Sequence, residues 1–248
     1  MRSDYLRIAG LAFLFFVPFL GAVHLFDWNE IYVAECTREM LVTGNFLCPQ
    51  LDFQLFWETP PLFLWFQAIS MQVFGISEFG ARFPNAVCGI ATMLLVFHLG
   101  SRLHDRAFGW LWALAWLGSL LPHLYFRSGI IDPWFNLLIF LSLYGFIEFR
   151  WLSFTRFVGC CFCQRFRYLI LGGLVLGLAV LTKGPLGYAI VILTLLAYFA
   201  RYGFRNKGFA RHLAYFTLAA ISVSILWFGV EMTLHGSSFA WTYLEHQY

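Results

Sequence analysis

The chain has 248 residues, of which 60% are hydrophobic, 21% aromatic and only 12% charged, and its formal net charge is +3. Soluble domains are typically about 45–50% apolar and about 25% charged, so a soluble enzyme, a disordered chain and a nucleic-acid-binding module are excluded. The mean hydropathy of +0.72 and the long uncharged runs require lipid as the solvent. The composition predicts an all-α, polytopic membrane bundle that uses nearly the whole chain, 1–248, as one module.

The apolar runs predict about seven membrane spans, since a helix needs about 20 such residues to cross the hydrocarbon core. The runs lie at 6–26, 83–101, 107–126, 132–149, 168–182, 186–200 and 213–232. No small-residue cleavage site follows the first run, so we interpret it as an uncleaved span rather than a signal peptide. An eighth apolar run, 60–76, is shorter and contains two glutamines.

The positive charges decide the status of segment 60–76. Twelve of the sixteen Lys and Arg residues cluster at 2–7, 102–106, 150–167 and 201–211, and such clusters favour the cytoplasmic side. Placing all four inside predicts an internal N-terminus, an external C-terminus and a first outer loop, 27–82. Segment 60–76 then lies along the outer surface as an interfacial helix. Its aromatic side chains, Phe63, Trp65, Phe66 and Phe74, are expected among the lipid headgroups. Ten of the thirteen acidic residues fall at or near this face, which indicates a site there.

The six cysteines show no metal-binding spacing. Cys160, Cys161 and Cys163 form a cluster with no histidine nearby, whereas a structural zinc site uses about four ligands, so we predict no metal ligands. Cys36 and Cys48 can form a bridge if they face an oxidising compartment.

Four ionisable residues fall at the outer ends of predicted spans: Arg127, Asp132, Lys183 and Glu231. Charged groups at membrane depth are costly and usually functional. Lys183 lies in Leu181-Thr182-Lys183-Gly184-Pro185, where a tight turn between two helices suits phosphate binding, although snorkelling to the interface explains the lysine equally well. Asp132 precedes Pro133 at the start of a span, and its position alone favours a helix N-cap over a functional role.

The first outer loop is the densest polar region. It contains Asp27, Asn29 and Glu30, then a short helix expected at 34–41, then Glu58 and Thr59. A carboxylate beside a membrane-facing cleft can accept a proton from an attacking hydroxyl. A solvated loop whose charges cap a short helix is the alternative.

Four short motifs follow one another on this face: the acidic stretch from Asp27 to Glu35, then Glu58-Thr59-Pro60-Pro61-Leu62, then Arg127 to Asp132, then the Lys183 motif. In this order they resemble the ArnT-like and protein O-mannosyltransferase group of GT-C membrane glycosyltransferases. The likeness covers essentially all 248 residues, but it covers only the N-terminal module of that family, whose members continue with further spans. The resemblance implies seven spans, with helices lying along the membrane in the first outer loop.

The resemblance implies an inverting transfer of a sugar from a polyprenyl-phosphate donor to a hydroxyl of a lipid, glycan or protein acceptor. Its site would lie on the periplasmic, outer face of a bacterial inner membrane, among membrane lipids and without nucleic acid. The product would belong to the cell envelope, through lipopolysaccharide or protein glycosylation. No cofactor is implied with certainty, and a divalent metal is left open.

The resemblance also assigns roles to individual residues. Lys183 matches the phosphate-side lysine, Asp132 the second outer-face acid, and Glu58 the glutamate of a Glu-Lys-Pro-Pro motif. Glu30 and Glu35 match the first acidic motif, but Asn29 stands where its catalytic aspartate is expected, and Thr59 stands where the motif lysine is expected. Asp27 is the substitute base.

We expect the predicted acids and Lys183 to converge on one outer cavity, with Arg82 and Arg127 nearby as phosphate contacts. Asn29 and Thr59 predict weak or absent transfer in this chain, which makes it a truncated or impaired member. The alternatives are a catalytically inactive scaffold and a membrane transporter. A transporter would carry polar residues at mid-membrane depth, and the spans hold few.

Overall fold

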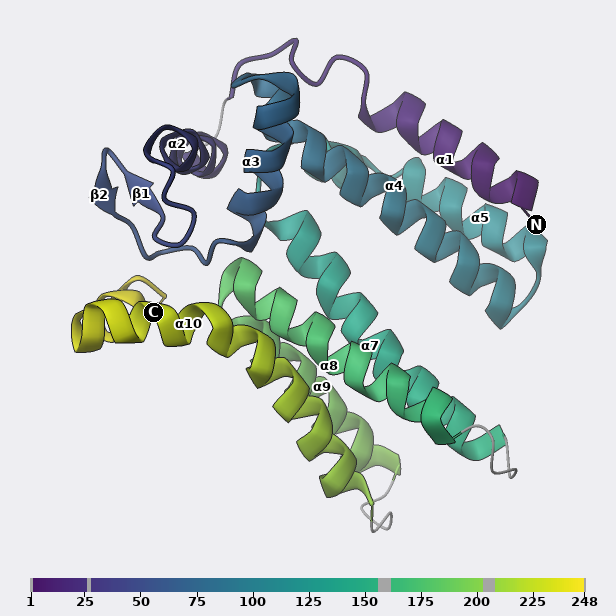
Figure 1. The fold of residues 1–248 in the computed structure, drawn as a ribbon. Helices are drawn as coiled ribbons and strands as arrows, with labels where there is room; N and C mark the ends of the chain where they lie inside the picture. The colour runs from purple at the N-terminus through teal and green to yellow at the C-terminus, as the bar shows by residue number, and fades with distance from the viewer. Residues whose placement is uncertain (1, 26–27, 156–161, 203–207, 248) are drawn as a thin grey trace. The chain divides into compact units, whose positions relative to one another are not determined.

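The computed structural model describes residues 2–25, 28–155, 162–202 and 208–247, drawn in colour in Figure 1. Within these ranges the chain is predominantly helical, which confirms the predicted class. In chain order the elements are α1 (Arg2–Phe16), α2 (Trp28–Thr43), β1 (Gln50–Leu51), β2 (Gln54–Leu55), α3 (Leu62–Phe74), α4 (Glu78–Leu103), α5 (Arg106–Leu117), α6 (Leu120–Tyr125), α7 (Asp132–Thr155), α8 (Phe162–Lys183), α9 (Leu186–Tyr202) and α10 (Phe209–Gln247). The two short strands pair with each other in the first loop, a feature that the sequence analysis did not predict.

The chain divides into two compact units by its contacts. Unit 1 comprises Met1–Phe46, Gln50–Gln54 and Phe63–Trp134, and unit 2 comprises Leu47–Pro49, Leu55–Leu62 and Phe135–Tyr248. The boundary therefore passes through the first loop and through the first turn of α7. The single module over 1–248 stays a prediction.

In unit 1, α1 packs on α4, and α4 packs on α5 (Figure 1). The Tyr5 ring of α1 meets the Phe97 ring of α4 edge-on, with centroids 5.1 Å apart. Glycine allows the close approach of α4 and α5, because a Cβ on Gly109 would lie 2.8 Å from the Phe97 carbonyl oxygen. Ser77 caps α4 by accepting a hydrogen bond from the Gly80 amide at 3.2 Å, which satisfies one of the open amides of the first turn.

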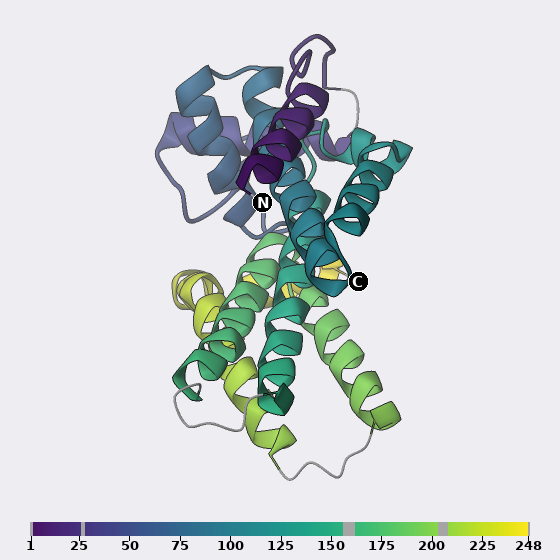
Figure 2. The same ribbon diagram turned by 90° about the vertical axis from the view of Figure 1, so that its right-hand side faces the viewer.

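In unit 2, α8 packs against both α9 and α10, and the three helices lie in one bundle with α7 (Figure 2). Small residues make these contacts close. A Cβ on Gly145 of α7 would lie 2.9 Å from the Gly172 Cα of α8, and a Cβ on Gly177 would lie 2.5 Å from the Ala220 carbonyl oxygen of α10. Small residues at helix interfaces are typical of membrane bundles, where backbones pack directly on one another.

Five of the seven predicted spans lie inside single helices, α4, α7, α8, α9 and α10. The other two predictions were wrong in extent. The run 6–26 is helical only to Phe16, because Pro18 lacks an amide hydrogen and disfavours helix at the residue before it. The run 107–126 breaks at Gly118 and Ser119 into α5 and α6. The helical segment α10 also continues past the predicted span 213–232 to Gln247, with a kink at Gly236.

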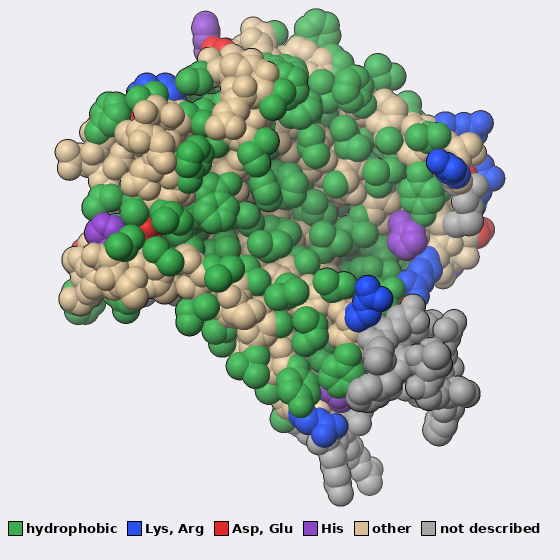
Figure 3. Space-filling view, in the orientation of Figure 1, with side chains coloured by type: hydrophobic (Ala, Val, Ile, Leu, Met, Phe, Trp, Pro, Cys, Tyr) green, Lys and Arg blue, Asp and Glu red, His purple; other side chains and the backbone are tan. Residues whose placement is uncertain are grey.

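Three helices of the described residues are long and apolar enough to cross a membrane: Glu78–Leu103, Phe166–Lys183 and Phe209–Tyr243. The total of about seven spans therefore stays a prediction. Many large apolar side chains are exposed on the helices, and hydrophobic side chains, coloured green, are spread over much of the face seen in Figure 3. Such a surface suits a lipid solvent rather than water.

The first loop differs from its prediction in three respects. The helix expected at 34–41 is present but longer, as α2. Helix α3 corresponds to the interfacial segment, but its Phe63 is fully buried in the protein rather than placed among headgroups. Cys36 and Cys48 are buried and are not joined by a disulfide. Cys160 and Cys161 lie outside the described residues.

Candidate active site

A buried ion pair between Glu30 of α2 and Arg82 of α4 is the centre of the polar part of unit 1. Arg82 donates from Nε to Glu30 Oε1 at 2.7 Å and from Nη2 to Glu30 Oε2 at 2.8 Å. Its guanidinium also donates to the carbonyl oxygens of Leu20, Val23 and His24, at 2.6–3.0 Å. Both charged side chains are buried, with 0% and 3% exposure. Arg82 therefore fixes the chain that follows α1 against the start of α2.

The same carboxylate holds the segment that leads into Asp132. Glu30 Oε1 accepts a hydrogen bond from the Gly129 amide at 2.6 Å. Asn85, one turn after Arg82 on α4, donates to the carbonyl oxygens of Ser128 and Ile130, both at 2.6 Å. Glu30 of the acidic first-loop motif and residues 128–130, which precede α7 and lie about 100 residues further along the chain, are thus held together by hydrogen bonds.

Arg127 lies at the start of this segment, and its contacts are with backbone. Its Nη2 donates to the Pro18 carbonyl oxygen at 2.8 Å, and its Nη1 lies 3.5 Å from the Phe15 carbonyl oxygen. Phe15 lies in the last turn of α1, where backbone oxygens lack helical donors, and Pro18 lies just after the helix. The observed contacts of Arg82 and Arg127 are therefore structural, and phosphate binding by either residue stays a prediction.

Asn29, which stands where the catalytic aspartate is expected, is exposed to solvent, unlike the residue that follows it. Asn29 lies in the first turn of α2 and is exposed, whereas Glu30, the next residue, is fully buried. Asp27, the substitute base, lies outside the described residues. Further along α2, Arg38 hydrogen-bonds to Glu35, with Nε 2.9 Å from Oε2, and this holds the pKa of the Glu35 carboxyl below its ordinary value.

Glu58, Thr59 and Lys183 belong to unit 2. Thr59 is buried at 6% exposure, and its hydroxyl has no hydrogen-bond partner among the described residues. Glu58 is half-buried. The first loop therefore presents a buried polar atom at the position where the resembling family has a lysine.

Lys183 is the last residue of α8, and its position follows from the turn after it. Gly184 adopts φ +86° and donates its amide to the Val180 carbonyl oxygen at 2.8 Å, a helix end that favours glycine. Helix α9 then begins at Leu186, directly after Pro185, as predicted. The Lys183 ammonium lies 5.9 Å from the centre of the Phe135 ring, within reach of a cation–π attraction.

The structure therefore brings together part of the predicted set. Glu30, Arg82, Arg127 and the start of α7 at Asp132 share unit 1, while Glu58, Thr59 and Lys183 share unit 2. The single cavity predicted for all of them stays a prediction. The sequence analysis missed Asn85, whose signal was an amide within the apolar run 83–101.

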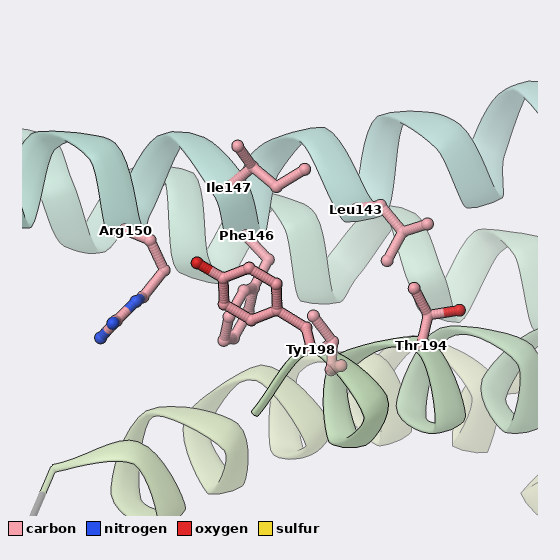
Figure 4. Close-up of a pocket in the computed structure, with 7 residues that line it drawn as sticks. Leu143, Phe146, Ile147, Arg150, Thr194 and Tyr198 are labelled. Atoms are coloured by element: carbon pink, nitrogen blue, oxygen red, sulfur yellow. The ribbon is translucent and has the colours of Figure 1, made fainter. Parts of the chain in front are cut away.

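A cavity of about 440 Å³ lies between α7 and α9 in unit 2 (Figure 4). It is lined by Leu143, Phe146, Ile147, Arg150, Thr194, Leu195 and Tyr198. None of the predicted site residues contributes to it, and its lining is mainly apolar. This cavity is therefore distinct from the polar network described above.

Comparison with known proteins identifies related sequences. Residues 58–227 match the family described as dolichyl-phosphate-mannose-protein mannosyltransferase. An uncharacterized protein of Aquifex aeolicus is 31% identical over 192 residues, which are 77% of this chain and 42% of that protein. The undecaprenyl phosphate-alpha-4-amino-4-deoxy-L-arabinose arabinosyl transferase 2 of Proteus mirabilis is 26% identical over 237 residues, covering 91% of this chain and 39% of that enzyme. The chain thus spans about two-fifths of the length of these relatives.

Solved structures share the fold. ArnT from Cupriavidus metallidurans, in the apo state, superposes with a TM-score of 0.85 at 20% sequence identity, covering 100% of this chain and 45% of that one. The structure of the same protein bound to undecaprenyl phosphate gives the same TM-score, with 99% of this chain covered. At this identity the likeness establishes the fold.

Proposed function

This chain belongs to the dolichyl-phosphate-mannose-protein mannosyltransferase family and is ArnT-like, and we propose that it forms the membrane module of a glycosyltransferase. The enzyme moves a sugar from a polyprenyl-phosphate donor to an acceptor hydroxyl. The site faces the periplasmic side of a bacterial inner membrane. Support comes from relatives named as undecaprenyl-phosphate arabinosyl transferases and from the related ArnT structure with undecaprenyl phosphate bound.

The observation that carries the proposal is the Glu30 carboxylate, which accepts from both Arg82 and Gly129. This contact ties the first-loop acidic motif to the segment that leads into Asp132. A transfer reaction needs its acidic groups held in a fixed geometry before substrate arrives. Glu30 itself is buried in the ion pair, so we assign it a positioning role.

In the proposed reaction the acceptor oxygen attacks the anomeric carbon, forming a new glycosidic bond in a single inverting displacement. The bond from that carbon to the phosphate oxygen breaks, and the lipid phosphate leaves with its electron pair. A carboxylate takes the proton of the acceptor hydroxyl, a role that we give to Asp27 or Asp132. Glu58 orients the donor. Lys183, at the end of α8, stabilises the charge that develops on the phosphate.

Two residues lower the expected activity. Asn29 places an amide, which cannot act as a base, at the position where the family has its catalytic aspartate, so the proton must go to Asp27 or Asp132 instead. Complete loss of a general base typically costs about 10²- to 10⁴-fold in rate, which sets the upper limit of this effect. Thr59 stands where the family has a lysine, so a cation beside the phosphate is absent from this position. Loss of one electrostatic donor lowers the rate about 10²- to 10³-fold. The wild-type protein is therefore expected to transfer sugar slowly.

The test is transfer from a labelled polyprenyl-phosphate sugar by membranes that contain the full-length protein. Wild type is compared with Asn29→Asp, Thr59→Lys and the double variant, and Arg38→Met serves as a control away from the proposed chemistry. We expect the double variant to exceed wild type by at least about tenfold. Full wild-type activity that is lost in Asp27→Asn would place the base at Asp27. No response to any of these changes, with no transfer by wild type, would favour an inactive scaffold.

A further inference from the structure

Three side chains that bind transition metals meet in unit 2, outside the set predicted for sugar transfer. Cys48 comes from the first loop, and Glu231 and His235 lie one turn apart on α10. One ligand atom from each residue, the sulfur, a carboxylate oxygen and a ring nitrogen, lies within 4.8 Å of the other two. The sequence analysis noted Glu231 at the outer end of a span but gave it no role.

The Glu231 carboxylate is the polar group of this cluster whose burial most needs explanation. Glu231 is completely buried, and its Oε1 has no hydrogen-bond partner among the described residues. Its Oε2 accepts from the Trp57 indole nitrogen at 3.2 Å and lies 3.0 Å from His235 Nδ1. A buried carboxylate oxygen without a partner is costly, and a metal ion bound by this carboxylate would reduce that cost. A Glu231–His235 pair that only stabilised α10 would not account for the cysteine sulfur within 4.8 Å of both residues.

The surrounding contacts hold the three ligands in place without a metal. Trp227 of α10 donates from its indole nitrogen to the Leu47 carbonyl oxygen at 2.8 Å. This hydrogen bond holds Leu47, the residue before Cys48, against α10. The Trp57 ring packs edge-on against His235, with centroids 5.1 Å apart. Directly after His235, Gly236 adopts φ +62°, and α10 bends (Figure 1). The site is therefore built by packing rather than by chance exposure.

We propose that Cys48, Glu231 and His235 bind a divalent transition metal, with zinc as the expected ion. Sulfur and imidazole ligands select zinc over magnesium or calcium, which prefer oxygen. Zinc bonds of about 2.0–2.3 Å place tetrahedral ligands about 3.3–3.8 Å apart, so side-chain shifts of about 1 Å close the observed cluster. Binding releases the thiol proton to solvent. Three protein ligands leave a fourth position for water or an oxygen of another molecule.

The test uses full-length protein purified in detergent, stripped with a chelator and titrated with Zn²⁺ and with Co²⁺. We expect one zinc per chain and a near-ultraviolet Co²⁺ charge-transfer band from thiolate. Cys48→Ser should remove the band, and Cys48→Ser, Glu231→Gln and His235→Gln should each weaken zinc at least about tenfold, as even indirect changes at zinc sites do. The matched controls are Cys36→Ser, a buried cysteine of unit 1, and His24→Gln, an exposed histidine.

Three results would overturn the proposal: no zinc retained by wild type, affinity unchanged in all three ligand variants, or a cobalt band that Cys36→Ser also removes. A measurement on wild type alone guards against misfolded variants. Zinc should slow the alkylation of Cys48, but not that of Cys36, as followed by mass spectrometry. Equal alkylation rates with and without zinc would also contradict the site. None of these readouts depends on sugar transfer, so the metal site can fail without the proposed function.

Discussion

Replacing Arg82 with methionine should destabilise the protein strongly. The substitution keeps an unbranched side chain but leaves the Glu30 carboxylate buried at 0% exposure without its cation. It also removes the donors to the Leu20, Val23 and His24 carbonyl oxygens. Removing one partner of a buried ion pair costs about 3–5 kcal/mol. For a chain of this size each kcal/mol lowers the Tm by about 2–4 °C, so we expect a loss of about 6–20 °C.

The assay is thermal unfolding of the purified protein in detergent, followed by circular dichroism. Arg38→Met is the matched control, because Arg38 pairs with Glu35 at the surface of α2, and surface pairs contribute little. The double variant Glu30→Gln with Arg82→Met should lose less than the sum of the single losses, since the amide still accepts from Gly129 and carries no charge. An Arg82→Met variant as stable as Arg38→Met would show that the buried Glu30–Arg82 ion pair does not stabilise the protein.

Further predictions concern packing, pH and topology. Gly177→Ala should lower the free energy of unfolding by about 1–3 kcal/mol, because its Cβ would lie 2.5 Å from the Ala220 carbonyl oxygen. The control is Gly10→Ala, whose Cβ would meet nothing within 4 Å. Equal Tm values for the two variants would contradict the close α8–α10 contact. Arg38 lowers the pKa of Glu35 in the folded protein. Wild type should therefore be more stable than Glu35→Gln above about pH 5, and this advantage should disappear as the pH falls through the folded pKa of Glu35. A stability difference that does not change with pH would argue against the ion pair. A cysteine at the exposed Ile76 should react with an impermeant reagent from the outer side, and labelling only from the cytoplasm would refute the topology.

Apolar runs were sufficient to predict five of the helices. The runs that correspond to α4, α7, α8, α9 and α10 are long and apolar, and a helix pairs the backbone groups of such a run within the run itself. Helix ends were harder to predict. Helix α1 ends at Phe16, just before Pro18 and ten residues before the end of the predicted span at residue 26. At the other end of the chain, Gly236 kinks α10, and the chain is helical on both sides of the kink, beyond the predicted span 213–232. Local backbone chemistry decided both, and a hydropathy run averages over it.

The candidate site was predicted less completely because its geometry depends on contacts between distant segments. The sequence analysis singled out Glu30 and Arg82 as candidate site residues, but their mutual pairing across 52 residues has no sequence signal. The same holds for Asn85, whose contacts with Ser128 and Ile130 appear only once α4 and the entry to α7 are folded together. The Cys48, Glu231 and His235 cluster joins residues about 180 positions apart, which no spacing rule for metal ligands detects.

The most direct test of the account is the binding of a polyprenyl phosphate by the full-length protein. Native mass spectrometry of the purified protein can compare undecaprenyl phosphate with the uncharged lipid undecaprenol, for wild type, Lys183→Met and the exposed control Arg211→Met. We predict that wild type and Arg211→Met retain the phosphate lipid in clear preference to the alcohol, and that Lys183→Met loses about tenfold or more of this preference because the phosphate loses its cation. Equal retention of the two lipids by wild type, or a preference that Lys183→Met leaves intact, would contradict the proposed donor site.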